Sequence, residues 1–226
     1  MAEKKTLLIL RLEGALQAWG EMSKWDFRDS ADFPTKSGIV GLLGCALGLE
    51  RGDPMLGELN TALKLAVRAD RQGTRTVDFQ TVTGNPLLNA EGKPKSGGNT
   101  IISRRAYLQD ACFTAFLDLP EEWQARVANA LCEPKWPIFL GRKNCVPSRP
   151  VWEAESSDYA SLEEAVHLYP AAERVDMPMV YEVEEPSPAL GSHLRPDSRL
   201  DGGRNFALRR VWRGAVKEEQ HDSDEN

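Results

Sequence analysis

The chain has 226 residues, of which 41% are hydrophobic and 27% charged, so it can bury a core and is too apolar for wholesale disorder. No window approaches the roughly 18 consecutive apolar residues of a membrane-spanning helix, and the apolar stretch after Met1 is too short for a signal peptide. Four cysteines occur without a C-x-x-C pair and with only three histidines. We therefore expect neither a disulfide framework nor a metal site, and a cytoplasmic location without membrane contact.

The net charge of -6 is unevenly distributed along the sequence. Residues 153–188 carry ten acids and one base, and residues 217–226 carry five acids and one base. The rest of the chain holds 26 bases against 19 acids and is therefore basic. A basic body suits a polyanionic partner, although ordinary solvated Lys and Arg side chains would give the same composition. We expect the acidic tail, 217–226, to be disordered.

The first predicted elements are a buried strand over 6–13, a helix over 39–49 and a second strand over 63–70. Thr and Ser precede the helix as capping candidates. Four glycines recur at three- and four-residue steps from residue 38 to residue 48 and share roughly one helix face. Each costs the helix about 1 kcal/mol relative to alanine, so the helix backbone on this face is expected to lie close to some other part of the molecule.

A polar connection over 71–103 follows, rich in Gly, Lys and Arg, and then a long strand over 107–119. A second helix is expected to begin near residue 120, and a fourth short strand spans 138–141. The order β-α-β-β-α-β predicts an α+β protein with a ferredoxin-like domain over residues 1–150. From residue 151 to 216 we expect a smaller, less regular extension packed on that domain.

Two segments concentrate groups that can bind anions. Gly141, Arg142 and Lys143 follow a predicted strand, where an Arg fork and a Gly-containing turn could hold phosphate, or could form a plain basic turn. Lys36 and Ser37, with the Gly38 amide, stand at a helix start, where free N–H groups favour anions or an ordinary cap forms. Neither segment matches a nucleotide-binding fingerprint, so no cofactor is expected.

Other candidates lie on the remaining loops. Arg104 and Arg105 enter the third strand and could hold a nucleic-acid backbone, or form the charged base of a solvated hairpin. Trp19 and Trp25 could stack on bases, although a single aromatic such as Trp19 is more often part of a core. Catalytic groups are scarce. Only His193, in a Gly/Ser/Pro loop, keeps a histidine-based acid–base site open.

Several co-linear blocks of the sequence resemble one known family. They are Leu8–Gly20, Phe33–Gly44, Tyr107–Thr114, Phe139–Cys145 and Asn205–Ala207 with the basic residues after it. In the same order they are similar to the motifs of the CasD family, RAMP-superfamily subunits of the type I-E CRISPR surveillance complex Cascade. The resemblance extends from about residue 6 to residue 216 and leaves the acidic segments poorly matched.

The resemblance implies a ferredoxin-like, RNA-recognition-type fold with a protruding thumb hairpin, for which residues 71–103 are the natural candidate. It also implies an RNA-binding subunit that caps the 5′ handle of the CRISPR RNA (crRNA) and contacts the backbone RAMP subunit and the large subunit. Target DNA would be met only through the assembled complex. Carried over by position, Lys36, Ser37 and Gly38 would contact the handle backbone, Arg104 and Arg105 the RNA at the thumb base, and Gly141, Arg142 and Lys143 the handle.

A related branch of the family, in type I-C systems, cuts CRISPR RNA with a Tyr/Lys/His-type site. This sequence lacks a histidine in the corresponding middle region, and its Trp-Gly and Phe-Pro-Thr-Lys-Ser-Gly blocks fit the non-cleaving branch better. We therefore expect binding without catalysis, and retain a metal-independent endoribonuclease as the alternative.

Overall fold

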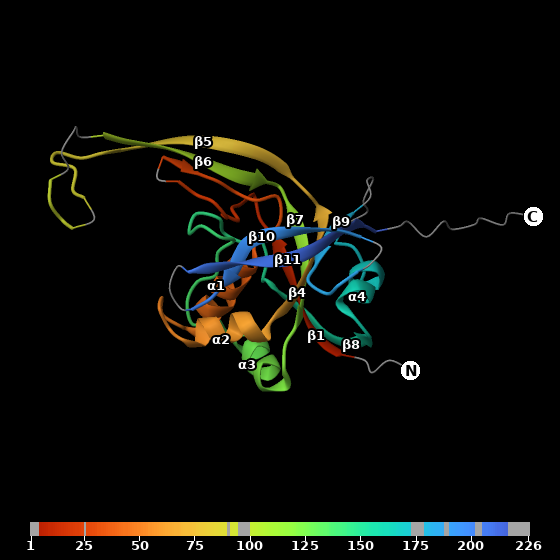
Figure 1. Ribbon diagram of the computed structural model, residues 1–226. Helices are drawn as coiled ribbons and strands as arrows, with labels where there is room; N and C mark the ends of the chain where they lie inside the picture. The colour runs from red at the N-terminus through yellow and green to blue at the C-terminus, as the bar shows by residue number, and fades with distance from the viewer. Residues whose placement is uncertain are drawn as a thin grey trace, which may run out of the picture.

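The computed structural model describes residues 5–24, 26–89, 91–94, 100–172, 179–187, 190–201 and 205–216, and the tail 217–226 lies outside them. It shows a mixed α+β protein with a mostly antiparallel sheet (Figure 1). Its elements are β1 Lys5–Glu13, β2 Leu16–Gln17, β3 Phe27–Arg28, α1 Lys36–Leu47, α2 Met55–Ala62, β4 Lys64–Arg71, β5 Thr74–Thr83, β6 Thr100–Gln109, β7 Cys112–Asp118, α3 Glu121–Cys132, β8 Trp152–Tyr159, α4 Leu162–Leu168, β9 Val180–Val183, β10 Gly191–Arg199 and β11 Phe206–Ala215.

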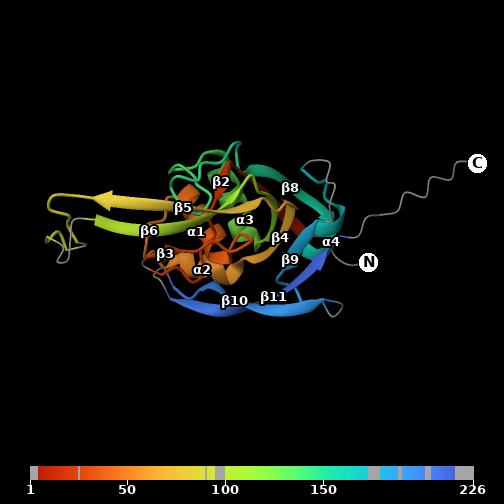
Figure 2. The ribbon, with the colours of Figure 1, turned by 90° about the horizontal axis from the view of Figure 1, so that it is seen from above.

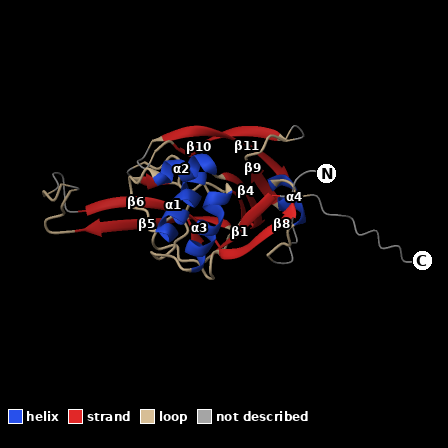
Figure 3. Cartoon of the chain, turned by 90° about the horizontal axis from the view of Figure 1, so that it is seen from below, coloured by secondary structure: helices blue, strands red, loops and turns tan. Residues whose placement is uncertain are grey.

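The main sheet has the strand order β10-β11-β9-β4-β7-β1-β8. Its central strands are buried on both faces, which explains the continuous apolar run in β1. Leu8, Leu10 and Leu12 pack on one face with α1, α2 and α3, whereas Leu7 and Ile9 pack with α4 on the other. Figure 3 shows α1, α2 and α3 grouped together and α4 apart from them. No helix among these described segments combines the length and apolarity that crossing a bilayer requires.

The predictions of the first two strands and both helices are confirmed, but the long strand over 107–119 is wrong. That stretch forms β6 and β7, separated by a turn in which Asp110 has a φ of 56°. The Asp110 amide donates to the carbonyl of Ala15, which fixes the turn. Asp tolerates this left-handed conformation better than most residues, so Asp110 is suited to the turn that ends β6.

The predicted fourth strand at 138–141 is also wrong. This segment forms a turn in which the amide of Leu140 donates to the carbonyl of Cys145. The strand that pairs with the outer edge of β1 is β8, beyond residue 150, in the acidic segment. The described parts of 151–216 are more regular than expected, since they hold four strands and α4.

The expected hairpin over 71–103 is present as β5 and β6, which pair from Thr74 with Gln109 to Thr83 with Thr100. It projects well beyond the helices (Figure 2). Residues 90 and 95–99 of the predicted thumb lie outside the described residues. The second strand continues into the body, where β6 also pairs with β2 and β3. The root of the hairpin is therefore built into the core.

Helix α1 begins where Thr35 accepts a hydrogen bond from the Gly38 amide, and it ends at Gly48, which has a φ of 72°. The glycine face has different neighbours along its length. A Cβ on Gly38 would lie 2.8 Å from the Trp19 ring, and one on Gly44 would lie 2.5 Å from Leu56. A Cβ on Gly41 would meet nothing within 4 Å. The expected close approach is therefore real at Gly38 and Gly44 and absent at Gly41.

This difference predicts opposite effects of two alanine substitutions in one helix. Gly41→Ala should raise the free energy of unfolding by about 1 kcal/mol, because it gains helix propensity at an open position. Gly38→Ala should lower it by about 1–3 kcal/mol, because the methyl group overlaps the Trp19 ring. Urea unfolding followed by circular dichroism measures both. Effects of the same sign and size would contradict this packing.

Candidate nucleic-acid interface

Arg142, a predicted phosphate ligand, makes its contacts inside the protein. Its Nη1 donates to the carbonyl of Ala106 at 2.8 Å, and its Nη2 donates to the carbonyls of Arg28 at 3.0 Å and Asp29 at 2.9 Å. Its guanidinium also lies over the ring of Tyr107, 4.7 Å from the centroid. The expectation of phosphate binding by Arg142 is therefore corrected. Its donors are directed at backbone carbonyls and tie the turn after β3 to β6.

The adjoining glycine also has a structural reason. Gly141 has a φ of 90°, and a Cβ there would lie 1.7 Å from the carbonyl oxygen of Ala18. Only glycine fits this approach, so Gly141 is required by the chain itself. Lys143 is exposed on the same loop, and Asn144 donates to the hydroxyl of Tyr107 at 3.0 Å. Of the three residues predicted here, the loop presents the Lys143 side chain to solvent.

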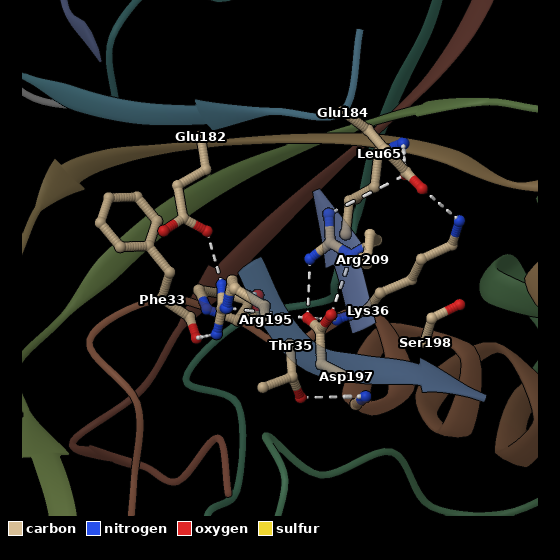
Figure 4. Close-up of polar contacts among 12 residues, drawn as sticks. Phe33, Thr35, Lys36, Leu65, Glu182, Glu184, Arg195, Asp197, Ser198 and Arg209 are labelled. Atoms are coloured by element: carbon tan, nitrogen blue, oxygen red, sulfur yellow. Dashed lines mark hydrogen bonds and ion pairs between the residues drawn. The ribbon is translucent and has the colours of Figure 1, made fainter. Parts of the chain in front are cut away.

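The start of α1 already has an anion. The amide of Lys36 donates to Asp197 at 2.9 Å, and its ammonium group donates to Glu184 at 2.7 Å (Figure 4). Lys36 is only 4% exposed. In this conformation neither its amide nor its ammonium group faces an incoming phosphate, so the expected site is corrected to an internal ion-pair site. Ser37 is half-buried, and the Gly38 amide donates to Thr35.

These contacts belong to a buried network that we call the Asp197 cluster, formed by Lys36, Glu182, Glu184, Arg195, Asp197 and Arg209. Arg209 donates to the two oxygens of Asp197 at 2.9 and 2.7 Å, and Arg195 donates to Glu182 at 2.5 Å. The residues come from α1, from β9 and the residue that follows it, and from β10 and β11. The cluster therefore fastens the β10–β11 ribbon to the helix start.

The cluster shifts the pKa values of its members in opposite directions. Burial would raise the pKa of Asp197, but hydrogen bonds and charge from Arg209, together with Arg195 and the Lys36 amide, hold it below its ordinary value. Burial is the main cause that lowers the pKa of Lys36, and Glu184 opposes it. The lowered pKa of Asp197 shows that neighbouring cations stabilise its charged form. The lowered pKa of Lys36 shows that Glu184 offsets only part of the cost of removing the ammonium group from water.

Trp19 lies in the core rather than on the surface. It is 1% exposed, its indole N–H donates to Gln17, and Gly38 lies against its ring. The assignment of Trp19 to an RNA site is therefore wrong, because a buried ring cannot stack on a base. The core assignment, the alternative kept for a lone aromatic, is correct. Trp25 lies outside the described residues.

Among the predicted basic residues, Arg104 has the surroundings best suited to binding a nucleic acid. It is exposed on β6 and pairs in register with Phe79 on β5 and Phe27 on β3. The two phenylalanines are 57% and 40% exposed, and Ile102 on the same strand face is 52% exposed. We call Phe27, Phe79, Ile102 and Arg104 the hairpin face. Arg105 points to the opposite face of β6, and its Nε donates to Ser103.

Sequence patterns alone did not identify Phe27 and Phe79 as candidate site residues. A signal was present in β5, where Val77 and Phe79 alternate with polar residues in a strand pattern. The sequence pattern does not show which residues of neighbouring strands lie side by side. Only the registers of β3, β5 and β6 place both rings beside Arg104.

The two described histidines also make internal contacts. The Nε2 atom of His193 lies 3.2 Å from Glu182, and the His167 ring lies 3.2 Å from the hydroxyl of Tyr181. Tyr181 is 2% exposed, and burial with the neighbouring Glu163 raises its pKa to about 12. Within the described parts of the chain, no group of three or more His, Cys, Asp or Glu residues is placed to hold a metal ion.

The Asp197 cluster generates a stability prediction. Asp197→Asn should lower the free energy of unfolding at pH 7 by about 3 kcal/mol, because it leaves buried cations without their anion. Since the folded-state pKa of Asp197 is depressed, its contribution is present above about pH 4 and is lost as the pH falls through the folded pKa.

Urea unfolding between pH 3 and pH 7 measures this effect, with the exposed Asp158→Asn as the matched control. The deficit of Asp197→Asn relative to wild type should narrow toward low pH, whereas Asp158→Asn should stay near wild type throughout. A pH-independent deficit, or none at pH 7, would contradict the assigned role of Asp197.

Comparisons with known proteins agree with this architecture. The sequence pattern of the family described as CRISPR-associated protein (Cas_Cas5) matches residues 7–220. Among curated proteins, the CRISPR system Cascade subunit CasD of Escherichia coli (strain K12) is 33% identical over 160 residues, which make up 66% of this chain and 70% of that protein.

Two solved structures are similar over nearly the whole chain. One, described as a CRISPR RNA-guided surveillance complex, has a TM-score of 0.76 and 29% identity, and the match covers 93% of this chain and 90% of that one. The other, described as a crystal structure of a Cas protein, has a TM-score of 0.74 and 32% identity, with coverages of 94% and 96%. Sequence and fold therefore agree, and this chain belongs to the CRISPR-associated Cas5 family, as a CasD-type subunit of an RNA-guided surveillance complex.

Proposed function

We propose that this chain is the non-catalytic subunit of a type I-E Cascade complex that binds the 5′ handle of the crRNA and helps assemble the complex. The observation that carries the proposal is the hairpin face, where Arg104 stands between two exposed phenylalanines. The name of its relative, a Cascade subunit, and that of the similar structure, an RNA-guided complex, support the proposal.

The hairpin face combines the two interactions that single-stranded RNA offers. Exposed aromatic rings can stack on splayed bases, which contributes about 1–3 kcal/mol per base. A guanidinium group can hold the phosphate between two such bases. Lys143 is exposed on the loop that Arg142 fastens to β6, so it can add a second positive charge near the hairpin root.

The proposed fold assignment is ferredoxin-like. The strands β4-β7-β1-β8 are adjacent in that order, and all three neighbouring pairs are antiparallel. Helix α1 lies between β1 and β4 in the chain, and α3 lies between β7 and β8. This arrangement supports two interleaved βαβ units, the split pattern of that fold. The units would present β5–β6 as an insertion between the second and third strands.

The proposed partners are the crRNA handle, the backbone RAMP subunit and the large subunit. Target DNA is met only through the assembled complex, in the cytoplasm. The long projecting hairpin supports such contacts, because it offers surface beyond the body that a neighbouring subunit can reach (Figure 2).

RNA binding by the hairpin face predicts separable effects of charge and stacking. With a single-stranded RNA that carries the repeat-derived handle, Arg104→Gln should weaken binding and reduce the slope of log K against log salt by about 0.7, because one phosphate contact is lost. Phe79→Leu should weaken binding about tenfold without changing the slope, because it removes stacking only. Fluorescence anisotropy at several salt concentrations measures both.

Arg149→Gln is the matched control. Arg149 is also exposed, and its guanidinium pairs with Glu153 on β8 at 2.7 Å. Its affinity and salt slope should equal those of wild type. If Arg104→Gln behaves like this control, the hairpin face is not the RNA-binding surface.

The alternative function, metal-independent cleavage of repeat RNA, is tested directly. Purified protein incubated with repeat RNA in EDTA should leave the RNA intact, and denaturing gel electrophoresis detects any product. Cleavage at one position that disappears in His193→Ala would overturn the non-catalytic assignment and favour the endoribonuclease.

A further inference from the structure

A pocket of about 320 Å³ lies at the root of the hairpin. The loop before α1, β5, β10 and β11 contribute to its walls. The lining residues that matter here are Glu21, Asp32, Phe33, Arg75, His193 and Arg213. The volume suits one small ligand unit rather than a helix or an extended chain.

The pocket mouth carries an ion pair that can open at little cost. Arg75 on β5 donates to Asp32 at 2.6 Å, and the two side chains are 47% and 66% exposed. Exposed pairs of this kind contribute at most about 1 kcal/mol. A ligand that offers an anion to Arg75 and a hydrogen-bond donor to Asp32 would replace the pair with two new contacts.

Arg213 contributes a flat cationic group to the lining of the pocket. The guanidinium of Arg213 lies over the Phe33 ring at 4.9 Å from its centroid, and its Nη2 donates to Glu182 at 2.5 Å. Its side chain remains 43% exposed, and His193, which shares Glu182, is 39% exposed beside it. A guanidinium plane held in this way can stack on a nucleobase.

We propose that this pocket holds one unpaired nucleotide of the bound RNA. The base stacks on Arg213 with its Watson–Crick edge toward Asp32, and the adjoining phosphate replaces Asp32 on Arg75. The inference rests on the proposed RNA-binding function and adds a subsite to it. Because guanine presents two adjacent N–H donors on that edge, it suits a carboxylate better than the other bases.

The position of the pocket supports continuity with the hairpin face. Arg75 and Phe79 lie on the same strand, and both pair with β6, as residues opposite Leu108 and Arg104. A strand crossing Phe79 could therefore reach Arg75 within the length of the same hairpin. The alternation of guanidinium, carboxylate and aromatic groups also fits a nucleotide better than a simple anion.

The test uses the full chain and single-stranded octauridylate, together with eight octamers in which one guanosine replaces each uridine in turn. Wild type should bind at least one guanosine octamer about tenfold more tightly than octauridylate. Asp32→Asn should remove this preference and keep the affinity for octauridylate. Arg75→Gln should weaken all octamers and reduce the salt slope by about 0.7, whereas Arg149→Gln should change neither.

The outcomes separate the two levels of the proposal. If wild type binds the octamers without preferring any guanosine position, or if Asp32→Asn retains the preference, the nucleotide pocket is contradicted and RNA binding stands. If wild type binds no octamer even at low salt, the RNA-binding function itself is contradicted. Both substitutions are at exposed side chains, and thermal unfolding should confirm that the variants remain folded.

Discussion

The three hydrogen bonds from Arg142 to backbone carbonyls fix where the hairpin leaves the body. They join the loop after residue 140 to the turn after β3 and to β6, segments that are far apart in the sequence. Gly141 allows this loop to lie against the carbonyl of Ala18, so the Arg142 side chain starts from a fixed position. Since β3 and β6 carry Phe27 and Arg104, the same bonds place the hairpin face. Arg142 thus supports the proposed RNA surface without belonging to it.

Much of the basic character of the body is used inside the molecule. The acidic segment 153–188 supplies Glu182 and Glu184 to Arg195 and Lys36, and Glu153 to Arg11 at 3.5 Å. Buried charges need such partners because removing them from water is costly. The separation of acidic and basic residues along the sequence therefore partly reflects ion pairs that form inside the protein. Counting bases overestimates the surface that is available to a polyanion.

The sequence predicted those elements whose pattern is local. The apolar run of β1, the capping Thr35 of α1 and the proline before α3 each act within a few residues, and these elements were found. The hairpin was found because its turn signals and its length are also local. The strand β8 was missed because its apolar alternation is limited to Trp152 and Ala154 in an acidic segment, and its partner β1 lies more than a hundred residues away.

The candidate site was harder to predict for a physical reason. An arginine beside a glycine has the same sequence whether its donors meet a phosphate or a carbonyl, and Arg142 proved to be the second case. Likewise, the start of a helix favours any nearby anion, and in this protein the anion is the Asp197 carboxylate on β10. Arg104 was identified, but its aromatic neighbours depend on strand register. The family resemblance supplied candidate residues, and only the fold distinguished supporting residues from exposed ones.

The most direct test of this account is photo-crosslinking of handle RNA that carries 4-thiouridine at successive positions, followed by mass spectrometry of the linked peptides. The account predicts crosslinks in peptides that contain Phe27 and Phe79, and none at the buried Trp19 or Lys36. Crosslinks confined to the start of α1, with none on β3 or β5, would contradict it.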